Sequence, residues 1–185
     1  GFHTQLHCNN FIETADRFIE CHIDREQATV SVGGHAALVR PYPISIAWPP
    51  SPLRNLPPAP ECHAAVLARY GLPADILLGV GVERFDFTKG IPDRFRAVEI
   101  LFERHPEWIG RFVLLQVAAP SRSNLPAYQE IQKESAAVAA QINSRFERGA
   151  YKPIILVAQH HEPEQVYELF RAADVAIVSS LPDGM

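Results

Sequence analysis

The feature that most constrains this chain is the regular alternation, from residue 76 onward, of short apolar runs with longer segments of helical spacing. The apolar runs cover residues 76–82, 111–117, 153–158 and 175–179. The helical segments between them cover residues 92–105, 125–147 and 163–172. Apolar runs of this length are typical of buried strands. Strands that alternate with helices through short connections form a parallel sheet, so the sequence predicts an α/β fold with a parallel, doubly wound sheet.

The residues before this region follow other patterns. Apolar side chains at helical spacing predict a helix from about Asn10 to Cys21. Two short strands are expected on either side of the Gly33-Gly34 turn. Eight of the sixteen prolines lie between residues 41 and 60, so this stretch is predicted to be extended and free of helix. A short helix from Glu61 to Tyr70 is expected to follow it.

The proline-rich stretch also predicts a domain boundary. We place one domain at residues 1–50 and a second at residues 51–185. The sequence starts at Gly1 rather than Met and stops directly after an Asp-Gly pair. We therefore expect the chain to be an internal piece of a longer protein, so its ends say little about targeting signals.

Composition narrows the classes of function. The 185 residues carry a net charge of −4, so no broad basic surface for nucleic acid is expected. No apolar run reaches the roughly 18 residues of a membrane-spanning helix, so no membrane partner is expected. The three cysteines form no C-x-x-C pair, which argues against a zinc ribbon or a disulfide framework and favours a reducing, cytoplasmic location.

The loops after the strands are the first places to look for a site, because doubly wound sheets bind ligands beyond the carboxyl ends of their strands. The loop at residues 83–90 carries Arg84 and Lys89 and leads into a helix. A helix N-terminus with two cations can hold phosphate, so we interpret this loop as a grip for the diphosphate of a sugar nucleotide. The alternative is that Arg84 and Lys89 only form surface pairs with Glu83 and Asp86.

The three other loops also carry polar residues. Arg122 can bind a second anionic group or can simply be solvated. His160 and His161 lack the spacing of a metal site, so we interpret them as polar lining or as helix-entry residues. Asp183-Gly184 is either a common turn or a carboxylate and amides directed at a polyol, and the pattern does not separate the two interpretations.

Several segments resemble a known family. The segment GVERFDFTKGIPDRFRAVEILFERHPEW, at residues 81–108, is similar to the signature of the trehalose-6-phosphate synthases, glycosyltransferase family 20. Further similar segments occur in family order, and these are GFHT, YPISI, QVAAPSRSNLPAYQEIQ, AQHHEPEQVYELFRAADV and the terminal LPDGM. The resemblance spans nearly the whole chain.

The resemblance implies a GT-B fold, in which two Rossmann-like domains face each other. Residues 1–50 would be the rear part of the N-terminal, acceptor-side domain, and residues 51–185 the front part of the nucleotide-sugar domain. The implied activity is retaining transfer of glucose from UDP-glucose to glucose 6-phosphate, which gives trehalose 6-phosphate. The implied partners are a nucleotide sugar and a sugar phosphate, with no metal or other cofactor.

The resemblance also assigns roles on the donor and acceptor phosphates. Arg84 and Lys89 match the pair that binds the donor diphosphate and act in catalysis. Arg122 matches the arginine on the acceptor's 6-phosphate, and His161 falls where the family makes backbone contacts to the nucleobase. No enzymic nucleophile is assigned, and the acidic neighbours, such as Glu83 and Asp86, are expected to hold Arg84 and Lys89.

The last residues carry the donor-sugar contacts that the resemblance implies. Asp183 matches the acidic residue that hydrogen-bonds the hydroxyls of the donor glucose, and the resemblance counts it among the catalytic residues. Gly184 and Met185 begin the run of backbone amides beside it. Family positions that bind the ribose and part of the acceptor lie outside this chain, so we expect the 185-residue piece to be inactive by itself.

Other interpretations stay open at this point. The acceptor can be another phosphorylated molecule, such as glycerol 3-phosphate, as in a glucosylglycerol-phosphate synthase. The chain can also belong to a non-catalytic, synthase-like regulatory subunit. A Rossmann dehydrogenase is disfavoured because no G-x-G-x-x-G turn follows the strand at residues 76–82. The sequence leaves open the donor nucleotide, homo-oligomer formation and a fused phosphatase domain.

Overall fold

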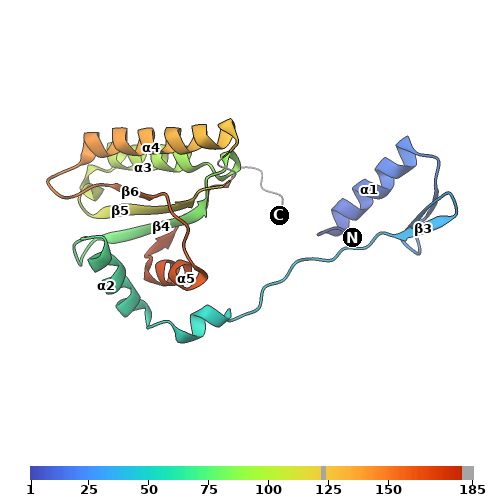
Figure 1. Cartoon of the computed structure of the whole chain (residues 1–185), viewed down its shortest axis with the longest axis horizontal. Helices are drawn as coiled ribbons and strands as arrows, with labels where there is room; N and C mark the ends of the chain where they lie inside the picture. Colours follow the sequence, from blue (N-terminus) through green and yellow to red (C-terminus); the bar gives the residue numbers. More distant parts are fainter. Residues whose placement is uncertain (122–123, 181–185) are drawn as a thin grey trace. The chain divides into compact units, whose positions relative to one another are not determined.

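The computed structural model describes residues 1–121 and 124–180, which form two compact units. One unit runs from Gly1 to Trp48 and the other begins at Pro49. Figure 1 shows the elements of both units, which are described separately below. Among the helices of the described residues, none is both long enough and apolar enough to cross a membrane.

The first unit packs one helix against a small antiparallel sheet. Its elements, in chain order, are α1 (Gln5–Phe18), β1 (His22–Asp24), β2 (Thr29–Val32) and β3 (His35–Leu38). The predicted pair of strands around the glycine turn is confirmed, because β2 and β3 pair on either side of Gly33 and Gly34. Both glycines have positive φ, which favours glycine over other residues.

The predicted boundaries of the first helix were wrong at both ends. Helix α1 begins at Gln5, five residues before the prediction, because the Thr4 hydroxyl caps it by accepting a hydrogen bond from the His7 amide at 3.3 Å. It ends at Phe18 rather than Cys21. The apolar spacing misled the prediction because it included Phe18, which is 79% exposed.

The second unit is built on a four-stranded parallel sheet in the order β6-β5-β4-β7. The strands are β4 (Leu77–Arg84), β5 (Phe112–Ala119), β6 (Ile154–Val157) and β7 (Val175–Ala176). This arrangement confirms the predicted parallel sheet. Strand β7 is shorter than the predicted strand, which extended to Ser179.

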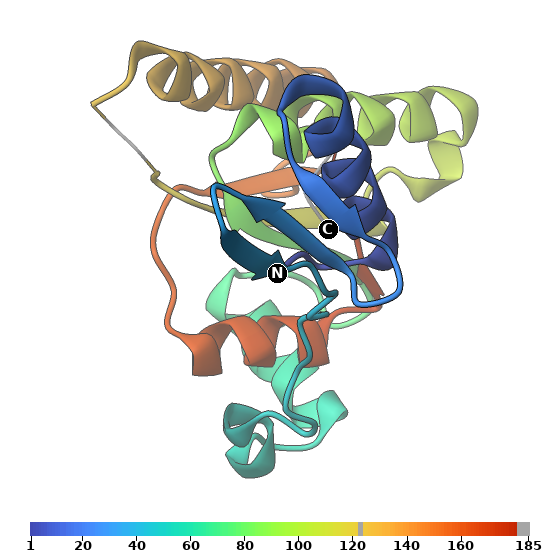
Figure 2. The same cartoon turned by 90° about the vertical axis from the view of Figure 1, so that its right-hand side faces the viewer.

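Helices cover both faces of this sheet. Helices α3 (Ile91–Arg104) and α4 (Pro126–Phe146) lie on one face, and α2 (Ala59–Arg69) and α5 (Pro163–Ala172) lie on the other (Figures 1 and 2). The sheet is therefore doubly wound, as expected. Short 3₁₀ helices add three turns, which are η1 (Ser51–Asn55), η2 (Phe87–Lys89) and η3 (Pro106–Trp108).

The proline-rich stretch is only partly extended. Its second half contains η1, and α2 begins inside it at Ala59, so the prediction that the whole stretch lacks helix was wrong. Pro60 lies in the first turn of α2, where the missing amide proton of proline costs no helical hydrogen bond.

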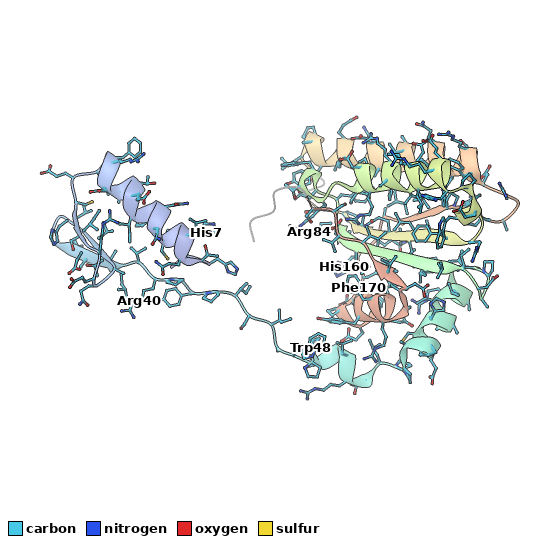
Figure 3. The ribbon with its side chains drawn as sticks, turned by 180° about the vertical axis from the view of Figure 1, so that it is seen from behind. His7, Arg40, Trp48, Arg84, His160 and Phe170 are labelled. Carbon is cyan, nitrogen blue, oxygen red and sulfur yellow. The ribbon has the colours of Figure 1, made fainter. Side chains whose placement is uncertain are left out.

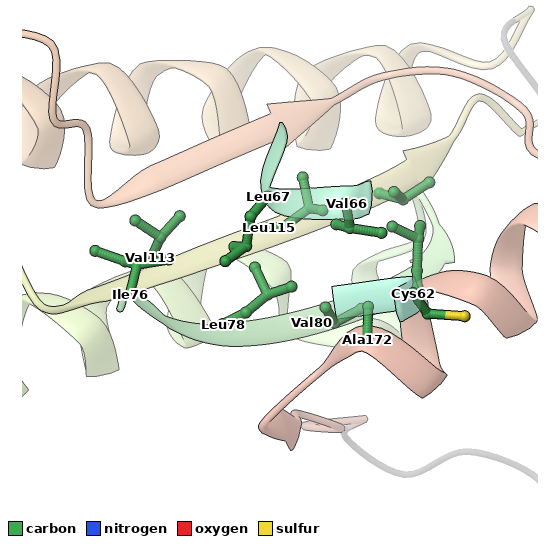
Figure 4. Close-up of a cluster of buried hydrophobic side chains, with 11 residues drawn as sticks. Cys62, Val66, Leu67, Ile76, Leu78, Val80, Val113, Leu115 and Ala172 are labelled. Atoms are coloured by element: carbon green, nitrogen blue, oxygen red, sulfur yellow. The ribbon is translucent and has the colours of Figure 1, made fainter. Parts of the chain in front are cut away.

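The core of the second unit is divided by the sheet into two apolar clusters. Side chains alternate along β4 and β5, so that Leu78 and Val113 pack toward α2 and α5 (Figure 4), whereas Phe112 and Leu114 pack toward α3 and α4. Because side chains on both faces of the sheet are buried, the pairing register of the strands is fixed. The carboxyl ends of the strands, and the loops that follow them, are consequently held at one edge.

Candidate functional site

The candidate site lies where β4, β5 and β6 end. In the parallel register Arg84 pairs with Ala119 and Val117 pairs with Val157, so the loops that follow these strands leave the sheet at the same edge. A hollow of about 440 Å³ opens there. Residues from all three strand ends or their loops line it, together with one residue of α5, and these are Val82, Glu83, Arg84, Lys89, Val117, Ala119, Pro120, His160, His161 and Val166. Figure 3 shows Arg84 and His160 at this end of the sheet.

Arg84, at the end of strand β4, points into the hollow because the next residue, Phe85, is buried on the opposite side of the strand. Phe85 is 1% exposed in the cluster under α3 and α4, and its amide donates to the Ala119 carbonyl at 2.9 Å. Adjacent side chains on an extended strand point to opposite sides. Arg84, the last residue of β4, therefore projects away from the Phe85 cluster and into the hollow.

A capped turn brings Lys89 to the same hollow. The Asp86 carboxylate accepts hydrogen bonds from the Thr88 amide and the Thr88 hydroxyl, both at 3.0 Å, and so caps η2, which ends at Lys89. Gly90 follows with φ 59° and ψ 35°, a left-handed conformation that turns the chain into α3. Residues 86–90 thus hold Lys89 on the side of the sheet edge that Arg84 occupies.

The charge of Asp86 is stabilised by the loop itself. The hydrogen bond from the Thr88 backbone amide lowers the pKa of Asp86, and the positive charges of Arg84 and Lys89 lower that pKa further. Asp86 was expected to hold the two cations, and that role stays a prediction.

For Glu83 the structure shows a partner that the sequence did not indicate. The Glu83 carboxylate forms its ion pair with Arg94 of α3, at 2.9 Å. Sequence reasoning missed Arg94, although a signal was present. Arg94 occupies the apolar stripe of α3 with Ile91, Phe95 and Val98, and a charged residue in such a stripe is buried only when it has partners.

The two adjacent histidines line the hollow from the third loop. His160 Nε2 lies 3.8 Å from the Glu162 carboxylate, and His161 Nδ1 lies 3.4 Å from the Gln159 carbonyl oxygen. The described residues contain no group of three or more histidine, cysteine, aspartate or glutamate side chains that could hold a metal ion. Both histidines are part of the wall of the hollow.

Some of the predicted site residues lie outside the described residues. These are Arg122, Asp183, Gly184 and Met185. The structure brings Arg84, Lys89 and His161 together at one hollow, and the roles of all seven residues stay predictions.

The arrangement suits a ligand with an anionic part and a flat, less polar part. Arg84 and Lys89 offer charge-assisted hydrogen bonds, and the N-termini of α3 and α5 point toward this edge. Val82, Val117 and Val166 give the hollow an apolar wall. A nucleoside diphosphate combines these two properties.

Known proteins resemble this chain over its whole length. The whole chain, residues 1–185, matches glycosyltransferase family 20. Over 188 residues, which cover all of this chain, it is 32% identical to the alpha,alpha-trehalose-phosphate synthase (UDP-forming) of Pichia angusta. The chain spans 38% of the length of that relative.

Two solved structures are similar over the full chain. One is the trehalose-6-phosphate enzyme of E. coli bound with UDP-2-fluoro glucose, at a TM-score of 0.81 and 28% identity. The other is the UDP-forming synthase of Burkholderia xenovorans in complex with glucose-6-phosphate, at a TM-score of 0.80 and 27% identity. This chain covers 40% of each. The predicted fold class, α/β of the GT-B type, is confirmed.

Proposed function

The chain belongs to glycosyltransferase family 20, and we propose that it is part of a retaining glucosyltransferase that moves glucose from UDP-glucose to glucose 6-phosphate. The product would be trehalose 6-phosphate. Relatives that are named UDP-forming trehalose-phosphate synthases support this reaction. The solved structure from E. coli is bound with a UDP-glucose analogue, and the one from Burkholderia xenovorans is in complex with glucose-6-phosphate.

The observation that carries the proposal is the joint position of Arg84 and Lys89. Both line one hollow at the carboxyl edge of the sheet, although a capped turn separates them in the chain. We assign them to the diphosphate of the donor. His161, in the same wall, is assigned to the part of the hollow that would receive the nucleobase.

These two cations also explain how the reaction can be accelerated. Negative charge builds up on the diphosphate as its bond to glucose breaks. Arg84 and Lys89 are already in place to stabilise that charge, and removing one such donor typically costs about 3 kcal/mol in the transition state. The proposal assigns this stabilisation to the two side chains, and it assigns no residue to a metal or to a covalent nucleophile.

The remaining roles complete the proposal. Arg122 would bind the phosphate of the acceptor, and Asp183, with the amides of Gly184 and Met185, would bind the donor glucose. Residues 1–50 would belong to the acceptor-side domain and residues 51–185 to the nucleotide-sugar domain.

An activity screen of the full-length protein that contains this chain tests the proposal. UDP-, GDP- and ADP-glucose would each be paired with glucose 6-phosphate and with glycerol 3-phosphate, and the products would be identified. We expect trehalose 6-phosphate from UDP-glucose and glucose 6-phosphate. If glucose were transferred only to glycerol 3-phosphate, the proposed acceptor would be wrong. If no donor and acceptor pair gave a product, the proposed enzymatic function would be rejected.

A pair of lysine variants tests the site. Lys89→Ala should reduce kcat/KM for the donor by about 100-fold, because it removes one preorganised donor from the diphosphate. Lys133→Ala is the matched control, since Lys133 is exposed on α4 and does not line the hollow. Equal activity of the two variants would reject the role of Lys89.

A further inference from the structure

Helix α3 places one arginine inside the protein, directly behind the cationic loop. Arg94 is 2% exposed, although it carries a permanent charge. Burying a charge without full pairing costs free energy, so Arg94 needs partners inside the protein. These partners indicate the role of Arg94.

Arg94 joins three neighbouring segments of the sheet. Its Nη2 donates to the Glu83 carboxylate at 2.9 Å, its Nη1 to the Gln116 side-chain oxygen at 2.5 Å, and its Nε to the Ser179 hydroxyl at 3.0 Å. Glu83 belongs to β4, Gln116 to β5, and Ser179 to the segment that follows β7. One guanidinium therefore connects the three segments at the edge where the hollow opens.

Arg94 also reaches both ends of the loop that carries the cations. At one end, its partner Glu83 directly precedes Arg84. At the other end, the Ser179 hydroxyl donates toward the carbonyl oxygens of Lys89 at 3.3 Å and Gly90 at 3.4 Å. A displacement of Arg94 would thus release the loop at both ends.

The network is tightly enclosed. A Cβ added at Gly81 would overlap the Arg94 guanidinium and the Gln116 side-chain amide. Gln116 is 0% exposed and donates through its Nε2 to the Val117 carbonyl oxygen at 2.9 Å. The surroundings leave little freedom for the guanidinium to take another position.

Glu83 adds an electrostatic reason for the pair. Glu83 is a lining residue of the hollow, while its carboxylate lies on the α3 side of β4, where it meets Arg94. An unpaired negative charge this close to Arg84 and Lys89 would weaken their attraction for an anionic ligand. Arg94 compensates this charge from behind the sheet edge. The hollow then keeps the positive charge of its loop for the ligand.

We propose that Arg94 is a positioning residue of the donor site, which neutralises Glu83 and holds both ends of the loop that carries Arg84 and Lys89. This inference rests on the proposed function, in which the hollow receives the diphosphate of a nucleotide sugar. Arg94 itself is placed behind the loop and acts only through Glu83 and Ser179.

The test uses Arg94→Met in the full-length enzyme, with Arg96→Met as the matched control. Arg96 lies on the exposed side of the same helix and pairs with Asp93 and Glu134. We expect Arg94→Met to lower kcat/KM for UDP-glucose by about 100-fold, as misplaced catalytic groups do, and to weaken UDP binding in calorimetry. KM for the acceptor and all constants of Arg96→Met should stay near those of the wild type.

A second pair of variants separates positioning from a merely structural role. Adding Glu83→Gln to Arg94→Met removes the carboxylate that the first change leaves unpaired. The double variant should therefore have a kcat/KM for UDP-glucose about tenfold higher than that of Arg94→Met. Ser179→Ala keeps the buried ion pair and releases only the far end of the loop. It should lower the same constant by about tenfold at an unchanged thermal midpoint, and it decides the test if Arg94→Met does not fold.

The outcomes distinguish this inference from the proposed function. An active wild type in which Arg94→Met behaves like Arg96→Met would overturn the inference and leave the function intact. So would a double variant that is no better than Arg94→Met, or, where Arg94→Met does not fold, a Ser179→Ala variant with wild-type kinetics. A wild type that neither transfers glucose nor binds UDP would overturn both.

Discussion

The two edges of the parallel sheet carry hollows of similar size and opposite character. The hollow at the carboxyl edge has a volume of about 440 Å³ and presents Arg84, Lys89 and two histidines. The hollow at the amino edge has a volume of about 380 Å³ and is mostly apolar, lined by Leu77, Leu101, His105, Trp108, Phe112, Asp174 and Val175. Volume therefore does not identify the site, whereas the chemistry of the lining does.

The topology explains this difference. In a doubly wound sheet each strand runs into a helix N-terminus at its carboxyl end, and each helix C-terminus leads back to the amino end. Helix N-termini carry partial positive charge and favour anions, whereas C-termini disfavour them. We therefore expect substitutions at the carboxyl edge to change the chemistry and those at the amino edge to change stability.

The largest expected effect is on stability at the amino edge. Phe112 is 7% exposed, and its ring leaves no room for a Cβ on Gly79 of the neighbouring strand. Phe112→Ala should lower the free energy of unfolding by about 3–5 kcal/mol, which denaturant titration of the full-length protein measures. Phe170→Ala, at a more exposed position, should cost less. A folded Phe112→Ala protein with a lowered kcat/KM would contradict the proposal that the amino edge affects only stability.

The second effect compares one arginine at each edge. Arg84→Ala should reduce kcat/KM for the donor by about 100-fold, equivalent to about 3 kcal/mol of transition-state stabilisation, with little change in the thermal midpoint. Arg111 precedes β5 at the opposite edge, 5.8 Å from the ring centroid of Trp108. Arg111→Ala removes the same charge and should leave the kinetics unchanged. Equal kinetic losses would mean that net charge, and not its position, matters.

The smallest effect concerns the cap of the cationic loop. Asp86→Ala removes the acceptor of the Thr88 hydrogen bonds and should cost about 1 kcal/mol of stability near neutral pH, whereas Asp86→Asn retains the acceptor and should cost less. The pKa of Asp86 is lowered in the folded protein from its ordinary value of 3.8. Its contribution is therefore complete above that value and is lost as the pH falls through the lowered pKa.

Unfolding titrations at several pH values check this sign. The difference in stability between the wild type and Asp86→Ala should shrink as the pH falls below 3.8. A difference that grows on acidification would mean that a group other than Asp86 controls the loop.

Much of the second unit could be predicted from the sequence because its signals are local. Helix α5 has the predicted bounds, Pro163 to Ala172, since a proline in its first turn and an apolar stripe mark it clearly. Gly90 marks the turn into α3 through its left-handed backbone. The first helix was harder, because the Thr4 cap lies outside the apolar pattern that was used.

The amino-acid sequence by itself determined the α/β order, the parallel sheet and the cationic character of the loop after β4. Only the tertiary structure decided which acidic residue serves which cation. Glu83 is adjacent to Arg84 in the chain, yet its carboxylate bonds to Arg94 of α3, because the strand and the helix bring these groups together inside the protein. Buried charges pair with whatever the packing places beside them, and no spacing along the chain encodes that choice.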